Sequence, residues 1–184
     1  MASERDARRR AYVDKTAAEV DSLAARGVAL AGNAFAAVLF LKGQPGPAER
    51  EGGEPLSGAD GRALRASLDR LGYAPEDWAA ALTCDFDENP LDPALVRELV
   101  SALDPGTLVC CDEAAADAVR EAWAEDLAVL PRFEEAMLQA GEVAQVAGMR
   151  VLNLGGFEAA LDDARAKQVM WARLKRIPPL GEPY

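Results

Sequence analysis

Glycines recur at positions 52, 53, 58 and 61, shortly after an apolar run that begins at Phe35 and ends at Lys42. Glycine has no Cβ, so a loop built from it lets the backbone approach a bound molecule closely. The loop continues into a helix with leucines at helical spacing, and the first N–H groups of a helix can bind an anion or the polar edge of a flat ring. The segment 52–64 is therefore a candidate ligand-binding loop.

The chain contains no histidine, which rules out Ser-His-Asp and Cys-His catalysis, His-ligated zinc and imidazole acid–base chemistry. Its three cysteines, Cys84, Cys110 and Cys111, are too few for a four-thiolate zinc or iron–sulfur site. Cys110 and Cys111 are adjacent, so in a strand they point to opposite faces. We expect three small buried hydrophobes, no catalytic residue, no metal and no cofactor.

Charge argues against nucleic acid as a partner. Lys and Arg total 20 against 31 for Asp and Glu, a formal net charge of −11, whereas duplex-binding proteins present a basic face to the phosphates. The basic clusters at 8–10 and 167–176 are interpreted as solvated helix faces. With no apolar run of about 20 residues and no secretory signal, we expect a cytoplasmic protein that does not enter a membrane.

Strand-like and helix-like segments alternate along the whole chain. Strands are expected at Phe35–Lys42, Ala80–Cys84, Thr107–Cys111 and Met149–Leu154, with a less certain short strand at Leu127–Leu130. An N-terminal helix is expected at about residues 6–26, with a buried stripe formed by Val13, Ala17, Val20 and Ala24. Further helices follow Gly61, Asp92, Asp112 and Gly156, and Asp92-Pro93 is a strong helix start.

This alternation predicts a single α/β domain over residues 1–184, with a mostly parallel sheet covered by helices on both faces. In such sheets ligands bind beyond the carboxyl ends of the strands. The loops after Lys42, Cys84, Cys111 and Leu154 all leave from those ends. We therefore expect a pocket where they meet.

The order of these motifs resembles the iron–sulfur type of uracil-DNA glycosylase. That family has a Gly-Glu-Ala-Pro-Gly turn and then a Gly-Arg-Pro-Phe-Val-Gly-x-Ala-Gly loop that opens a leucine-rich helix; Pro45-Gly46 and the loop 53–61 stand in the same order here. Later landmarks are the pattern at 148–156 and Trp171-Ala-Arg-Leu-Lys175, so the resemblance covers roughly residues 10–176. It implies a three-layer α/β/α sandwich with a central four-stranded, mostly parallel sheet.

The functional residues of that family do not carry over. On this resemblance Gly43 stands where the water-handling acid would be, Leu56 replaces the stacking phenylalanine, and Ala80 replaces the base-reading asparagine. The histidine motif falls on Gly155-Gly156, and only Cys84 matches a cluster ligand. Base excision needs a stacking ring, a reader of the base edge and a group that positions water.

We therefore favour a catalytically inactive protein with a glycosylase-like fold that binds an unknown small ligand or a protein. The candidate ligand-binding residues are Pro45, Gly46, Leu56, Gly58, Gly61, Gly155 and Gly156. In a simpler interpretation these glycines only close tight turns, and the nearby acids Glu49, Glu51 and Glu54 are solvated loop charges.

Two other functions stay open. The chain could be a DNA glycosylase that excises uracil or another damaged base with non-standard residues. It could also be a protein-interaction subunit with an exposed patch of Trp123, Phe133, Met137 and Leu138, although core packing is the better interpretation of that spacing. The sequence names no ligand or partner and leaves the oligomeric state open.

Overall fold

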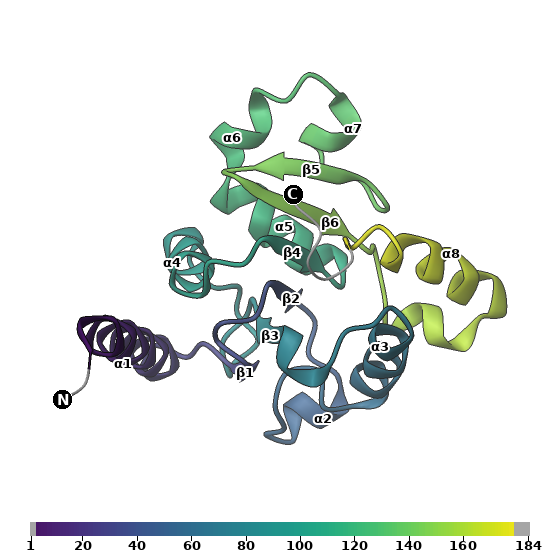
Figure 1. The fold of residues 1–184 in the computed structure, drawn as a ribbon. Coiled ribbons are helices and arrows are strands. Elements are labelled where there is room, and N and C mark those ends of the chain that lie inside the picture. The colour runs from purple at the N-terminus through teal and green to yellow at the C-terminus, as the bar shows by residue number, and fades with distance from the viewer. Residues whose placement is uncertain (1–2, 179–184) are drawn as a thin grey trace.

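The computed structural model describes residues 3–178 and contains one mixed, mostly parallel sheet of six strands (Figure 1). The strands are β1 (Leu30–Gly32), β2 (Val38–Lys42), β3 (Trp78–Leu82), β4 (Thr107–Cys110), β5 (Val143–Val146) and β6 (Met149–Asn153). Their order across the sheet is β1-β3-β2-β4-β6-β5. The four central strands run parallel, and the edge strands β1 and β5 pair antiparallel with β3 and β6.

Residues 3–178 also form eight α-helices and two short 3-10 helices. The α-helices are α1 (Glu4–Ala25), α2 (Pro47–Arg50), α3 (Ala59–Arg70), α4 (Pro93–Leu103), α5 (Glu113–Ala122), α6 (Ala124–Ala128), α7 (Phe133–Ala136) and α8 (Ala164–Leu174), and the 3-10 helices are η1 (Pro75–Asp77) and η2 (Ala159–Asp162). None of the described helices has the length and hydrophobicity that a bilayer span requires.

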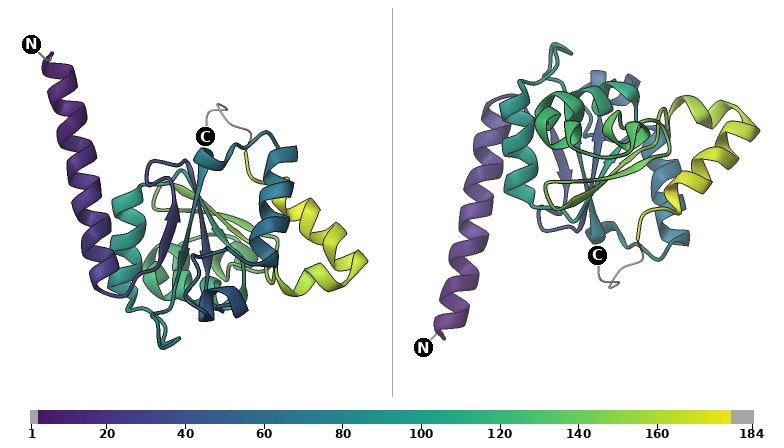
Figure 2. Two further views of the ribbon diagram at one scale, coloured as in Figure 1. Left: turned by 90° about the horizontal axis from the view of Figure 1, so that it is seen from below. Right: turned by 90° about the horizontal axis from the view of Figure 1, so that it is seen from above.

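The central strand β2 explains why the sequence there is apolar without interruption. All five of its residues are buried, and successive side chains point to opposite faces of the sheet. Leu39 and Leu41 pack into one core with α1, α4, α5 and α6, whereas Val38 and Phe40 pack into a second core with α3 and α8. Helices therefore cover both faces of the sheet (Figure 2).

The four predicted central strands are confirmed, but a sheet of four strands is wrong because the sheet has six. The edge strands were missed because both are short, and none of the three residues of β1 is fully buried. The segment Leu127–Leu130, considered as a short strand, is not a strand, and its first two residues belong to helix α6.

The N-terminal helix is present, but its buried face differs from the prediction. Thr16 and Leu23 are its buried residues, while Val13, Ala17 and Ala24 are exposed. Only the second half of α1 packs on the body, against α4, and the first turns extend away from it (Figure 2). The neighbouring helix, rather than the most apolar stripe, decides which face is covered.

Candidate functional site

The candidate site lies at the carboxyl ends of the central parallel strands. The chain leaves β2 toward β3 on one side and leaves β4 toward β6 on the other, so the strand order reverses between β2 and β4. In α/β sheets this reversal opens a crevice outside the strand ends, and ligands bind there. In this protein the crevice is bordered by the loops after β2, β4 and β6.

An ion cluster occupies the crevice. Lys42, the last residue of β2, is buried, and its Nζ lies 2.6 Å from Asp60 Oδ2, 3.0 Å from Glu49 Oε1 and 3.1 Å from Glu158 Oε2. The Glu49 and Asp60 side chains are only 1% and 3% exposed, whereas Glu158 is 46% exposed. One ammonium thus pairs with three carboxylates, two of them deep inside the protein.

Backbone N–H groups hold the two buried carboxylates in addition to Lys42. Glu49 Oε2 accepts from Gly46 N at 2.8 Å, and its Oε1 accepts from Leu56 N at 3.0 Å. Asp60 lies in the first turn of α3, where the helix dipole favours an anion, and its Oδ1 accepts from Gly61 N at 2.8 Å. These bonds offset part of the cost of burying negative charge.

Lys42 stays protonated in this setting. Burial acts to lower the pKa of Lys42, but the hydrogen bonds to Asp60, Glu49 and Glu158 outweigh burial and raise that pKa above its ordinary value. A lysine that serves as a nucleophile or general base needs a lowered pKa instead. Lys42 is therefore a fixed cation that crosslinks three segments, and it is not available as a catalytic amine.

Asp112 is the fourth acid at the crevice, and it is also fully engaged. It caps α5 by accepting from Ala115 N at 2.8 Å, and it accepts from Gly43 N at 3.0 Å and Gln44 N at 2.9 Å. A Cβ on Gly43 would lie 2.6 Å from the Ala114 side chain, so the loop after β2 presses directly against the start of α5. Asp112 therefore ties β2 to α5, and both of its oxygens accept backbone N–H groups.

Little space remains once these side chains are in place. The cavity bordered by Lys42, Asp60, Asp112, Phe157 and Glu158 has a volume of about 60 Å³. That is room for about two water molecules at roughly 30 Å³ each. Ligand pockets commonly measure about 300–1,000 Å³, so the crevice itself is too small for a nucleobase.

A larger cavity of about 350 Å³ lies beside the crevice, on the β3 side. Its walls are the loop around α2 and the loop after β3, and they include Pro45, the Gly52-Gly53 turn, Leu82 and Cys84. At its rim Arg50 Nε pairs with Glu88 Oε1 at 2.7 Å, and this pairing raises the pKa of Arg50. This cavity reaches the size of a small-molecule site.

The 350 Å³ cavity lacks the ligands for an iron–sulfur cluster of the kind found in the family that the sequence resembles. Cys84 is the only thiol among its lining residues. Cys110 and Cys111 lie on and just after β4, buried in opposite cores of the sheet, as predicted. Burial raises the pKa of all three thiols, and Glu88 and Asp85 add to the effect at Cys84. Among residues 3–178 no group of three or more Cys, Asp or Glu is placed to hold a metal ion.

The structure does not bring the seven predicted ligand-binding residues to one cavity. Pro45 lines the 350 Å³ cavity, and Gly156 lines the 60 Å³ cavity. Gly155 and Gly156 border a separate, shallow hollow next to α8. Leu56 and Gly61 are buried, and the backbone of Gly61 is pressed so closely on the Leu56 carbonyl oxygen that a Cβ would overlap it.

Four of the five glycine N–H groups that were expected to hold a ligand already have acceptors within the protein. Gly46 N and Gly61 N donate to Glu49 and Asp60, as described above. Gly155 N donates to Asn153 Oδ1 at 2.8 Å, and Gly156 N donates to the Cys111 carbonyl at 3.1 Å. The anions held by this glycine-rich region are thus the protein's own carboxylates.

Sequence reasoning missed Lys42, Asp60, Asp112 and Glu158 as site residues, and it misjudged Glu49. Glu51 and Glu54 are exposed as expected, but Glu49 is buried and paired with Lys42. One signal was present in the sequence. A lysine at the end of a strand that is otherwise apolar on both faces needs an anionic partner, because a buried cation is almost always paired.

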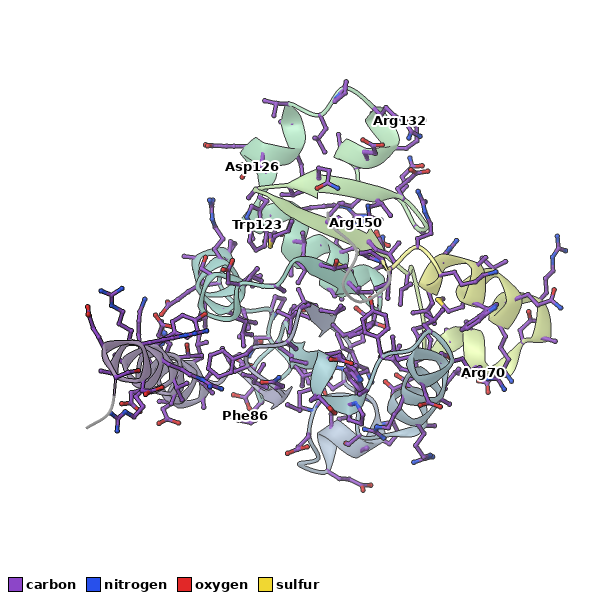
Figure 3. All side chains as sticks on the ribbon, in the orientation of Figure 1. Arg70, Phe86, Trp123, Asp126, Arg132 and Arg150 are labelled. Carbon is purple, nitrogen blue, oxygen red and sulfur yellow. The ribbon has the colours of Figure 1, made fainter. Side chains whose placement is uncertain are left out.

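The apolar patch considered for protein binding is only partly exposed. Trp123 and Leu138 are buried in the core, whereas Phe133 is 67% and Met137 45% exposed. Among the large hydrophobic side chains of residues 3–178, Phe86 has the highest exposed fraction, 81%, and it lines the 350 Å³ cavity. Figure 3 labels this side chain.

Comparison of the sequence with protein-family models and with curated proteins finds no match.

Proposed function

We propose that this protein is a non-catalytic member of the glycosylase-like α/β/α sandwiches that binds a small ligand in the 350 Å³ cavity. The ion cluster at Lys42 is the observation that supports a non-catalytic protein. It fills the crevice at the strand ends with an ammonium and three carboxylates and leaves about 60 Å³. A base flipped into this position would meet a salt bridge instead of a stacking ring and a base-reading amide.

The hydrogen bonds and ion pairs of the acids support the same conclusion. A general base must have a free lone pair within reach of the attacking water. Glu49 and Asp60 are each shared between Lys42 and backbone N–H groups, and Asp112 accepts three N–H groups. Glu158, the exposed member, is also held by Lys42.

The 350 Å³ cavity beside the crevice supports the proposal that the protein binds a small ligand. It combines the apolar walls of Leu82, Cys84 and Phe86 with the exposed backbone of the Gly52-Gly53 turn. This mixture suits a flat, uncharged ring with polar edges, such as a free nucleobase. Nucleic acid is disfavoured because Asp85 and Glu88 line the same cavity, and their charge repels phosphates.

Two measurements test the proposal. An excision assay on single-stranded DNA containing uracil, hypoxanthine or xanthine should stay at background, and product above background would refute the non-catalytic assignment. A thermal-shift screen with nucleobases, nucleosides and phosphate at millimolar concentration should show a rise in Tm for at least one ring compound and none for phosphate. If no ring compound raises Tm, the ligand-binding half fails.

A matched pair of variants tests whether the rise in Tm comes from binding in the 350 Å³ cavity. Ala29 lines the cavity, so Ala29→Phe should fill it and abolish the shift in Tm. Ala24 is exposed on α1, so Ala24→Phe makes the same chemical change away from the cavity and should leave the shift intact. Loss of the shift in both variants would place the ligand elsewhere.

A further inference from the structure

A second cavity lies between α3 and α8, on the opposite side of the sheet from α4 and α5. Its volume is about 280 Å³, and it shares no lining residue with the 350 Å³ cavity. Figures 1 and 2 show α3 and α8 side by side in this layer. We call this cavity the α3–α8 slot.

The inner surface of the slot is apolar. Phe157, Met170 and Leu174, which belong to the core on this side of the sheet, line it, and the half-buried Trp171 adds an aromatic ring. Apolar area removed from water by a ligand contributes about 25 cal/mol per Å². The slot therefore offers a binding surface to the hydrocarbon part of a small molecule.

The charged residues of the slot are both cations. Arg70 ends α3 and Lys167 lies in the first half of α8; both are exposed, and no acid is among the lining residues. This composition differs from that of the whole chain, in which 31 acids outnumber 20 bases. It also differs from the 350 Å³ cavity, which is lined by Glu49, Asp85 and Glu88 but by only one arginine.

Neither cation of the slot is already neutralised. Among residues 3–178, Arg70 and Lys167 make no ion pair, whereas five other arginines, such as Arg26 and Arg120, do. A further cation, Lys175, stands 5.9 Å from the centre of the Trp171 ring. The rim is thus locally positive on a protein that is negative overall.

We propose that the α3–α8 slot binds a small amphipathic anion, with an aromatic or short aliphatic body and one carboxylate. The body packs against Phe157, Met170 and Trp171, and the carboxylate stays at the rim with Arg70 and Lys167. Carboxylates pair with arginine and lysine through charge-assisted hydrogen bonds. The neutral or cationic analogue of such a ligand gains the apolar contact alone and binds more weakly.

The test uses 4-phenylbutyrate and its neutral counterpart 4-phenylbutan-1-ol as probes. The two share one hydrocarbon body, so the difference in their binding measures the contribution of the carboxylate. We would follow the indole N–H signal of Trp171 in a ¹H–¹⁵N spectrum, assigned with Trp171→Phe, while titrating each compound to about 5 mM at low salt. We expect a saturable shift with the acid and about three- to tenfold weaker binding of the alcohol, as rim charge pairs commonly give.

Arg70, Lys167 and Lys15 are exposed, so substitutions of these three residues keep the test independent of folding. The double variant Arg70→Gln with Lys167→Gln should bind the acid about as weakly as the alcohol and leave alcohol binding unchanged. Lys15→Gln on α1 removes an exposed charge far from the slot and serves as the matched control. Ala63→Met, on the α3 side of the slot, should reduce binding of both probes by filling it.

Three results would overturn the inference. One is the absence of any shift at Trp171 with the acid. Another is equal binding of the acid and the alcohol, which would leave the cations without a role. The third is acid binding that the double variant does not weaken. None of these outcomes depends on the 350 Å³ cavity, so this inference and the proposed function fail or hold separately.

Discussion

Lys42→Met tests the ion cluster most directly. Methionine keeps an unbranched apolar stem but removes the ammonium, which leaves the Glu49 and Asp60 carboxylates buried without their cation. Removing one partner of a buried ion pair costs about 3–5 kcal/mol, because the remaining charge stays buried and uncompensated. The backbone N–H groups of Gly46 and Gly61 continue to hold these carboxylates. We therefore expect a loss of about 3 kcal/mol, measured by urea unfolding at pH 7.

The pH dependence of the same variant has a defined sign. The pKa of Lys42 is raised in the folded protein, so the stability that Lys42 contributes is fully present below its ordinary value of about 10.4 and is lost as pH rises above it. The difference in unfolding free energy between wild type and Lys42→Met should stay constant from pH 7 to 9 and shrink at higher pH. Groups outside the ion cluster that titrate in this range cancel in the difference.

A second substitution separates charge from packing. Asp60→Asn should destabilise the wild type, because it removes a charge that Lys42 needs. In the Lys42→Met background the same change removes an uncompensated buried charge, so it should be neutral or stabilising. Lys15→Met, at an exposed ion pair with Glu19, is the control and should hardly move the midpoint. If Lys42→Met behaved like this control, or if Asp60→Asn acted equally in both backgrounds, the reasoning would be refuted.

The remaining predictions concern the frame of the site. Gly61→Ala should destabilise the protein by at least about 1–3 kcal/mol, the range typical of overpacking, because the new methyl group overlaps the Leu56 carbonyl. This loss should exceed the gain from the better helix propensity of alanine. An unchanged Tm in thermal unfolding would contradict this close contact. Asp112→Ala should lower the free energy of unfolding by about 2 kcal/mol, which is more than Asp92→Ala should cost. Asp112 holds the loop after β2 in addition to capping its helix, whereas Asp92 only caps its helix. Equal losses in urea unfolding would argue against the link between Asp112 and that loop. Cys110 and Cys111 should react with a thiol reagent at neutral pH only when the protein unfolds, because both are buried and burial raises the pKa of each thiol; rapid labelling in native buffer would show that β4 is accessible.

Hydrophobic pattern was sufficient to predict the centre of the sheet. A strand buried on both faces, such as β2, is apolar along almost its whole length, and this pattern can be recognised without knowing how the strand packs. Helix starts at Asp92 and Asp112 were also readable, because an N-cap acts within its own turn. The edge strands β1 and β5 could not be predicted in this way, since pairing with a neighbour, and not their composition, makes them strands.

For the candidate site, too, some features could be predicted from the sequence and others could not. The sequence by itself excluded imidazole chemistry, because the chain has no histidine. The glycosylase resemblance adds the prediction that the base-excision residues are missing, since it places glycine or alkyl groups at the positions of those residues. The sequence also determined that loops from several strands meet at one edge. Only the tertiary structure decided that Lys42, Glu49, Asp60 and Glu158 meet there and close the crevice, and that cavities lie beside β3 and between α3 and α8. The physical reason is that ion pairs and cavities depend on distances between segments far apart in the chain, whereas hydrophobic periodicity and capping are local properties.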